Sequence, residues 1–255
     1  MQFPLGLINS LRSTRTVTVL TGAGISAESG LPTFREANIA AETGNALWSQ
    51  YRPEDLATPD AFERNPELVW EFYAMRRLKN GQIQPNPGHA ALVEMERYIP
   101  NFTLITQNVD GLHQLAGSMI VIELHGNITR VKCSRGCSVF TEWDDRPGQV
   151  PTCPECGSKL RPDVVWFGEM LPKAGLEAAI ESARNSEMFF SIGTSGLVQP
   201  AASLALLAKK NGALVVEINT EKTQLTENVD YFLKGKSGQV LPDLVREVWR
   251  SQSLD

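Results

Sequence analysis

The 255-residue sequence has no apolar run long enough to cross a membrane, and its first twenty residues lack the continuous apolar core of a signal peptide. It also has no low-complexity tract, and 42% hydrophobic and 21% charged residues exclude a disordered or fibrous chain. Positive charge is in deficit, with a formal net charge of -5 and a pI near 5.4. We therefore expect a globular cytoplasmic protein that binds neither nucleic acid nor membranes.

Cysteine is scarce, and all four cysteines fall in two close pairs, C-x3-C and C-x2-C: Cys133, Cys137, Cys153 and Cys156. In a reducing compartment this pattern favours a metal site over disulfides. Four thiolates fill a tetrahedral coordination shell, so a zinc ion held by them would be structural rather than catalytic. Iron in a rubredoxin-like site and free buried cysteines are the alternatives.

Short β-rich runs and helix-like segments alternate along the chain. The predicted buried strands are residues 16–20, 102–106, 120–124, 188–193 and 213–219. The predicted helices between them include residues 88–97, 174–185 and 200–211. This alternation predicts an α/β fold with a doubly wound, mostly parallel sheet.

Two segments interrupt the alternation. Residues 36–84 look helical, with Asn65 and Pro66 as a cap and first turn, and residues 128–161 carry the cysteines with several Gly and Pro. We predict a smaller lobe made of these two modules, inserted into a sheet domain of residues 1–35, 85–127 and 162–255. The cleft between the lobes is the default place for a binding site.

A glycine loop, "TGAGISAESGLPTFR", follows the first predicted strand. Gly22 and Gly24 would let the backbone approach a ligand closely, and the helix that follows would offer free N–H groups to a pyrophosphate. The next glycine comes six residues later, so the loop is not the G-x-G-x-x-G dinucleotide fingerprint. A phosphate site and a tight strand-to-helix turn both remain open.

Polar residues also follow the other predicted strands: Gln107, Asn108 and Asp110; His125; residues 193–195; and residues 219–221. The carboxyl ends of parallel strands meet at one edge of a sheet, where open α/β sheets bind ligands. The amides and the carboxylate could fix a ribose or a carboxamide, or form a polar turn. His125 could be a general base or a structural histidine.

The stretch "FYAMR" places Tyr73 and Arg76 three residues apart on a predicted helix. They would share a face, so a phenol and a guanidinium could converge on one small anion. The alternative is a solvated helix edge. Arg77 would point elsewhere on the helix.

Taken together, "GAGISAESGLPTFR", "TQNVDGLH", "ELHG", the cysteine pairs, "RPDVVWFGE", "GTSGLVQPAA" and "EINTE" resemble the sirtuin family of NAD-dependent protein deacylases. The resemblance covers nearly the whole chain in order. It implies a Rossmann-like NAD-binding domain, a small lobe with one structural zinc ion, and a cleft where NAD meets an acyl-lysine peptide or protein. The first cysteine pair departs from the C-x2-C spacing often seen in the family.

The resemblance also implies roles for single residues. It makes His125 the catalytic base, with His89 and His113 structural. The implied cofactor-binding residues are Gly22, Ala23, Gly24, Ile25, Glu28, Phe34, Arg35, Gln107, Asn108, Asp110, Gly193, Thr194, Ser195, Asn219, Thr220, Glu221 and Ser237. The implied substrate-binding residues are Ala57, Tyr73, Arg76, Val165, Phe167 and Gly168, of which the last three resemble a strand that pairs with the substrate peptide.

Within the family, "FYAMR", Ala57 and Thr33 resemble the class that removes succinyl, malonyl and glutaryl groups, in which the tyrosine and arginine bind the acyl carboxylate. The implied reaction transfers the acyl group to the ADP-ribose of NAD and releases nicotinamide. A general deacetylase, an NAD-dependent protein ADP-ribosyltransferase and a zinc-stabilised sensor without catalysis are the alternatives. The sequence does not indicate an oligomeric state.

Overall fold

The structure is a computed structural model that describes residues 2–31, 53–144, 146 and 148–249. Phe34 and Arg35, which the sequence assigns to the cofactor site, lie outside the described residues, as does Thr33. Within the described part of the chain, no helix is both long and apolar enough to cross a membrane.

The larger lobe is built on six parallel strands in the order β3-β2-β1-β7-β8-β9. Their bounds are β1 Thr16–Thr21, β2 Asn101–Thr106, β3 Val121–Glu123, β7 Met188–Ile192, β8 Leu214–Asn219 and β9 Tyr231–Lys234. The first five confirm the predicted strands. The sequence analysis missed β9, because four residues with an exposed Lys234 at the end give too short a pattern.

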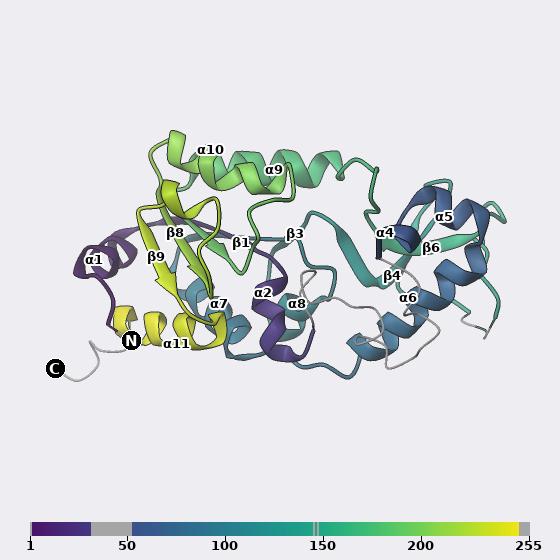
Figure 1. The fold of residues 1–255 in the computed structure, drawn as a ribbon, viewed down its shortest axis with the longest axis horizontal. Coiled ribbons are helices and arrows are strands. Elements are labelled where there is room, and N and C mark those ends of the chain that lie inside the picture. The colour runs from purple at the N-terminus through teal and green to yellow at the C-terminus, as the bar shows by residue number, and fades with distance from the viewer. Residues whose placement is uncertain (1, 32–52, 145, 147, 250–255) are drawn as a thin grey trace.

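Helices cover both faces of this sheet (Figure 1). One face packs against α1 (Leu5–Ser13), α7 (Pro87–Tyr98) and α11 (Ser237–Trp249), and the other against α9 (Lys173–Asn185) and α10 (Leu204–Lys210). Leu92 and Leu244 lie in the first of these two apolar cores, and Ala179 and Leu204 lie in the second. The three layers confirm the predicted doubly wound fold.

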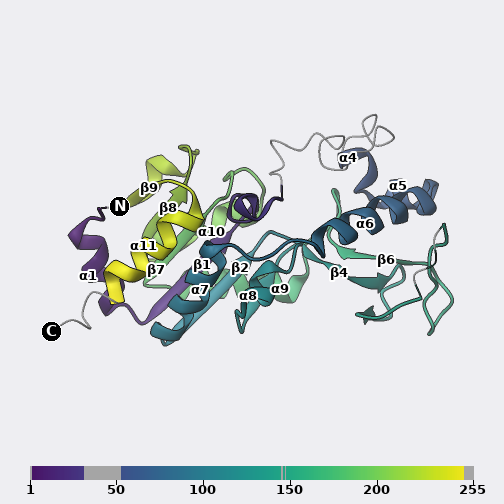
Figure 2. The same cartoon turned by 90° about the horizontal axis from the view of Figure 1, so that it is seen from below.

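In the smaller lobe, helices from the described part of the chain lie beside a second sheet (Figure 2). The helices are α4 (Pro53–Leu56), α5 (Pro59–Arg64) and α6 (Pro66–Asn80), and the antiparallel sheet has the order β5-β4-β6, with β4 Gly126–Cys133, β5 Val139–Phe140 and β6 Leu160–Val164. This sheet reaches from 126 to 164, a few residues beyond the predicted 128–161 at each end. The division into three modules stays a prediction.

The helix that carries "FYAMR" begins where the sequence predicted. The Asn65 side chain accepts a hydrogen bond from the Leu68 amide at 3.1 Å, and Pro66 occupies the first turn. The buried side of α6 includes Val69, Phe72 and Tyr73. This packing holds the helix against strands β4 and β6 of the small sheet.

Candidate active site

The glycine loop lies where the strand order of the large sheet reverses, between β1 and β7. Here the Gly24 amide donates to the Gly193 carbonyl at 2.9 Å, and a Cβ on Gly24 would lie 2.6 Å from the Gly193 Cα. A Cβ on Gly193, whose φ is +60°, would lie 2.6 Å from the Ile25 amide nitrogen. Gly22 and Gly24 were predicted either to let a ligand approach or to form a tight turn. In the structure their close neighbour is the backbone after β7, and the ligand role stays a prediction.

A short helix, α2 (Ala23–Ser26), follows the glycine loop and is tied to the loop after β2. The Asn108 side-chain amide donates to the Gly22 carbonyl and to Ser26 Oγ, both at 3.1 Å. Ser26 Oγ donates in turn to Asp110 Oδ2 at 2.8 Å. Both amide hydrogens of Asn108 are therefore used, and none of the described residues donates to its Oδ1, which can accept a hydrogen bond from a ligand.

Asp110 is nearly buried, and burial raises the pKa of its carboxyl group above the ordinary value. Its Oδ1 accepts the Leu112 amide at 2.9 Å, at the start of α8 (Leu112–Ala116). The sequence analysis did not single out Ser26. Its place in the glycine motif carried no signal of a side-chain contact with Asp110.

His125 stands at the turn between β3 and β4. Its Nδ1 lies 2.8 Å from the Gln107 carbonyl oxygen, which can only accept, so Nδ1 carries the proton. Burial lowers the pKa of His125 below its ordinary value, which favours the neutral ring. Nε2 is then an unprotonated nitrogen of the kind that a general base requires.

The other two histidines are buried on helices, as the sequence predicted. The rings of His89 on α7 and His113 on α8 pack 4.9 Å apart, and His113 Nε2 lies 2.9 Å from Thr21 Oγ1. Burial lowers the pKa of His89 to about 4 and that of His113 to about 3, so both rings are neutral at neutral pH.

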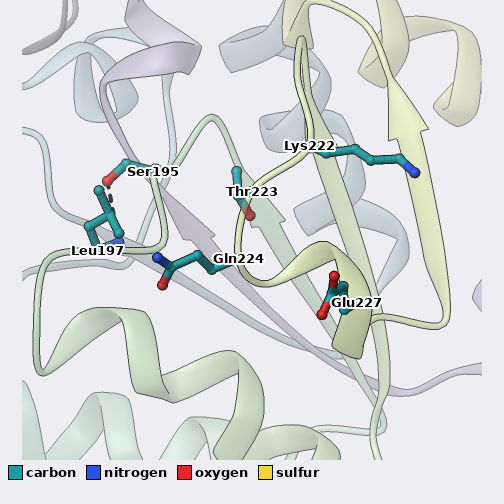
Figure 3. Close-up of a pocket in the computed structure, with 6 residues that line it drawn as sticks. All are labelled: Ser195, Leu197, Lys222, Thr223, Gln224 and Glu227. Carbon is teal, nitrogen blue, oxygen red and sulfur yellow. Dashed lines mark hydrogen bonds between the residues drawn. The ribbon is translucent and has the colours of Figure 1, made fainter.

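A cavity of about 490 Å³ lies beyond the carboxyl ends of β7 and β8 (Figure 3). Its lining residues are Ser195, Leu197, Lys222, Thr223, Gln224 and Glu227. In Figure 3 the Gln224 side chain points toward Ser195 and Leu197, and Lys222 points away from them. Only Ser195 was a predicted site residue. Leu197 lies in the motif "GTSGLVQPAA" but was given no role, and the other four residues follow "EINTE" in a segment that carries no motif.

Asn219 joins the two loops beside this cavity. Its side-chain amide donates to the Thr194 carbonyl at 2.8 Å, and its Oδ1 accepts the Thr220 amide at 2.9 Å. Thr220 and Glu221 are exposed at the surface. The predicted residues after β7 and β8 are thus brought together at one edge of the sheet.

A buried carboxylate fixes the cavity wall. Glu217 on β8 is 1% exposed and accepts hydrogen bonds from Thr223 Oγ1 at 2.6 Å and Thr226 Oγ1 at 2.5 Å. Glu217 is the first residue of the motif "EINTE" but was given no role, because a single acidic residue in an apolar strand pattern does not indicate a buried side-chain contact.

Glu28 and Ser237 meet at the start of α11. The Glu28 carboxylate accepts the Gly238 amide at 2.8 Å, so it already binds protein backbone at this helix N-terminus. Ser237 is buried, and its Oγ has no hydrogen-bond partner among the described residues. A buried hydroxyl of this kind suits a site that a ligand completes.

The residues predicted to bind the acyl group gather in the small lobe. Tyr73 is 3% exposed and shares an apolar cluster with Ala57, Phe62 and Trp166. The Arg76 guanidinium lies 5.5 Å from the centre of the Phe72 ring and 5.9 Å from that of Tyr73.

Arg77 points elsewhere, as predicted. Its guanidinium lies over the rings of Trp70 and Trp143, at 4.6 and 5.2 Å. Arg76 is therefore the arginine of this pair whose guanidinium lies beside the Tyr73 ring, and a ligand shared by Tyr73 and Arg76 stays a prediction.

The segment 165–168 connects His125 to this cluster. The Val165 amide donates to the His125 carbonyl and the Phe167 amide to the Ala57 carbonyl, each at 2.9 Å. In the structure β6 ends at Val164, and residues 165–168 form a loop that turns at Gly168, whose φ is +85°. The pairing of this segment with a substrate peptide stays a prediction.

Trp166, which the sequence analysis passed over, is the most constrained residue of that loop. Its Nε1 donates to the Tyr73 hydroxyl oxygen at 3.0 Å, and its backbone amide donates to Glu169 Oε2 at 2.8 Å. The Arg161 guanidinium lies 3.4 Å from the centre of the Trp166 ring and forms two hydrogen bonds to Glu169, at 2.6 and 2.8 Å. Protein groups thus contact the indole N–H, the ring face and the backbone amide of Trp166.

The four cysteines converge at the far end of the small lobe. Their Sγ atoms all lie within 4.8 Å of one another, and Cys133 and Cys153 are buried while Cys137 and Cys156 are exposed. Zn–S bonds of about 2.3 Å in a tetrahedron separate the sulfur atoms by roughly 3.8 Å. This cluster could therefore hold one zinc ion with only a small contraction, as predicted.

Comparisons with known proteins agree with this geometry. The Sir2 family matches residues 22–200. A Pyrococcus furiosus protein named NAD-dependent protein deacylase is 49% identical over 254 residues, covering 96% of this chain and 98% of the relative.

Two solved structures share the fold. A Sir2 homologue in complex with NAD superposes with a TM-score of 0.89 at 43% identity, covering 98% of this chain and 95% of that one. A mutant Sir2 homologue in complex with 2′-O-acetyl ADP ribose has a TM-score of 0.88 at 45% identity, covering 99% of each chain.

Proposed function

The chain belongs to the Sir2 family and is an NAD-dependent protein deacylase, and we propose that the acyl groups it removes from lysine are acidic: succinyl, malonyl or glutaryl. The observation that carries this proposal is the pairing of a buried phenol with a guanidinium on one face of α6. A carboxylate entering the cluster around Tyr73 loses its water, and a charge-assisted contact with Arg76 offsets that loss. An acetyl group has no charge to gain from either residue.

The residues at the switch point fit NAD. We propose that Asn108 Oδ1 accepts from the nicotinamide carboxamide, and that the cavity beside Ser195 takes the adenosine end. The buried Ser237 Oγ supplies a further unused hydroxyl. When bound, NAD supplies an electrophilic ribose carbon and nicotinamide as a leaving group.

His125 performs the proton transfer in this proposal. Its Nδ1–H is held by the Gln107 carbonyl, so Nε2 is free to take a proton from a ribose hydroxyl of the cofactor. The Val165 amide, bound to the His125 carbonyl, fixes the histidine backbone against the loop of residues 165–168. We propose that a substrate peptide binds along this loop, where Phe167 and Gly168 are exposed.

The test compares Arg76→Met with Arg77→Met on one lysine peptide carrying succinyl or acetyl. Arg77 is the matched control because it is the adjacent arginine and lies over Trp70 and Trp143. We expect R76M to lower kcat/KM for the succinyl peptide by about 10 to 200-fold, as a lost contact of about 1–3 kcal/mol implies, with acetyl removal retained. A wild type that prefers acetyl, with no change in R76M, would mark a general deacetylase.

A second reaction class, NAD-dependent ADP-ribosyl transfer to protein, would use the same cofactor residues. The cluster around Tyr73 has no role in that reaction and so gives no support to a transferase. Label from NAD that accumulates on a protein without consumption of acyl-lysine would support the transferase. Nicotinamide release that depends on acyl-lysine would support the deacylase and exclude a sensor without catalysis.

A further inference from the structure

We propose that Trp166 is a positioning residue for acyl selectivity: its indole N–H binds the Tyr73 oxygen and so directs the Tyr73 O–H toward the acyl carboxylate. This inference rests on the proposed function and adds a residue to it. Trp166 lies on the loop after β6 and Tyr73 on α6, 93 positions apart in the sequence.

The direction follows from the chemistry of the two groups. An indole N–H can only donate, so the Tyr73 oxygen must accept across the 3.0 Å contact. A phenol O–H lies in the plane of its ring and has two preferred positions, and the Trp166 donor occupies one side of the oxygen. Within the described part of the chain, no acceptor receives the Tyr73 O–H. The hydrogen is therefore directed to the side that Trp166 leaves open.

The donor is itself held in place. Glu169 accepts the Trp166 amide and binds Arg161, whose guanidinium lies 3.4 Å from the centre of the indole ring. Arg161 also donates to the Val164 carbonyl at 3.0 Å, so both the side chain and the backbone around Trp166 are anchored. A cation over the ring draws electron density from it, which strengthens the N–H as a donor.

Tyr73 stays a donor under working conditions. Burial raises the pKa of its hydroxyl group above the ordinary value, so the O–H remains protonated at neutral pH. Arg76 then supplies charge to an acyl carboxylate, and the Tyr73 O–H supplies a directed hydrogen bond. An acetyl group presents no carboxylate to this O–H, so its removal should not depend on Trp166.

The test is Trp166→Phe, which removes the N–H and keeps an aromatic ring, with Phe62→Leu as the matched control. Phe62 packs 5.4 Å from the Trp166 ring in the same cluster but takes no part in the hydrogen bond. We expect W166F to lower kcat/KM for the succinyl peptide about fivefold to tenfold, as for one lost buried hydrogen bond, with acetyl removal within about twofold. F62L should lower the thermal midpoint and leave the succinyl-to-acetyl ratio unchanged.

A double-mutant cycle separates the orientation of the Tyr73 O–H from the packing of the Trp166 ring. In a Tyr73→Phe background, W166F should produce no further fall in the succinyl-to-acetyl ratio, because the hydroxyl that it positions is absent. An equal loss for both acyl groups in W166F, or a further fall in the Y73F background, would overturn the inference. If the wild type prefers succinyl and R76M removes that preference while W166F keeps it, the inference fails and the proposed function stands.

A second measurement needs no Trp166 variant. The indole N–H proton resonance of Trp166, followed by NMR, should move downfield when the wild type binds a succinyl-lysine peptide, because linked hydrogen bonds strengthen one another. It should not respond in Y73F. A resonance that ignores the peptide in the wild type would contradict the inference.

Discussion

His125 donates its Nδ1 proton to the Gln107 carbonyl oxygen over 2.8 Å, so the end of β2 decides which nitrogen of the ring is basic. A carbonyl cannot donate, so this contact selects the tautomer with a free Nε2. The same residue accepts the Val165 amide through its backbone carbonyl at 2.9 Å. One histidine therefore joins the proposed cofactor loop to the proposed peptide loop.

We predict that His125→Tyr abolishes turnover while NAD binding survives, because the base is lost and the cofactor loops are untouched. Calorimetric NAD binding beside an acyl-lysine assay checks this. Near-normal turnover in H125Y would refute the assignment.

The pH profile gives a second check on His125. Burial lowers its pKa below the ordinary value of 6.5, and a base works only when deprotonated. Activity should therefore persist through pH 6.5 and fall only as the pH drops below that value. If the acid limb of the kcat/KM profile were centred above pH 6.5, the lowered pKa of His125 would be contradicted.

Gly126 is the first residue of β4 and should not tolerate a side chain. A Cβ there would lie 2.1 Å from the Asp163 carbonyl oxygen, at a φ of +79°. Gly136→Ala is the matched control, since Gly136 has the same φ and no atom within 4 Å of its would-be Cβ. We expect G136A to cost roughly 1–2 kcal/mol of unfolding free energy from backbone strain alone, and G126A to cost more and to impair turnover by displacing His125. If denaturant unfolding gave the same loss of unfolding free energy for G126A and G136A, the clash with the Asp163 carbonyl would be relieved at no cost in stability.

One zinc ion should bind per chain at the cysteine cluster, and its removal should unfold the small lobe. Four thiols within 4.8 Å of one another are coupled to the packing of β4 and β6, so metal binding there is also folding energy. Chelation, or Cys153→Ser, should lower the thermal midpoint and abolish turnover together. Elemental analysis that finds iron, or full stability after chelation, would contradict a structural zinc site.

Glu217→Gln should raise KM for NAD and leave the acyl preference unchanged. Its carboxylate receives hydrogen bonds from Thr223 and Thr226 and so holds one wall of the cavity beside Ser195. A neutral amide is a weaker acceptor, so we expect a rise of about threefold to tenfold. A fall in kcat with KM for NAD unchanged would show that the loop does not contact the cofactor.

The buried histidine pair should make the fold acid-labile. The pKa of His89 is lowered to about 4 and that of His113 to about 3, so below pH 6.5 the unfolded chain binds more protons than the folded one. Stability therefore falls as the pH drops from about 6.5 toward about 3. Thermal unfolding of the wild type and His113→Gln over this range should show a smaller loss in the variant, and parallel curves would contradict the assignment.

Much of the large lobe could be predicted because its signals are local. Apolar runs such as 16–20 and 213–219 are short and rich in residues that favour strands. The two residues Asn65 and Pro66 are enough to indicate the start of a helix. Strand β9 was not predicted because its four residues are too few for a periodic pattern. The loop at 165–168 was not predicted because its residues favour a strand, while the chain turns at Gly168. The strand propensity of a segment does not indicate whether its backbone amides form hydrogen bonds with residues distant in the sequence.

By itself, the sequence determined the residue types that the chemistry requires: four thiols in two pairs, a histidine after a strand, and a phenol and guanidinium one helical turn apart. Only the tertiary structure decided how those groups are aimed. The Gln107 carbonyl selects the His125 tautomer. The Gly193 backbone lies so close to residue 24 that only glycine fits there. Trp166 orients the hydroxyl group of Tyr73, although the two residues are 93 positions apart in the sequence. The physical reason is that a hydrogen bond depends on angle and distance between groups that only the folded chain brings together.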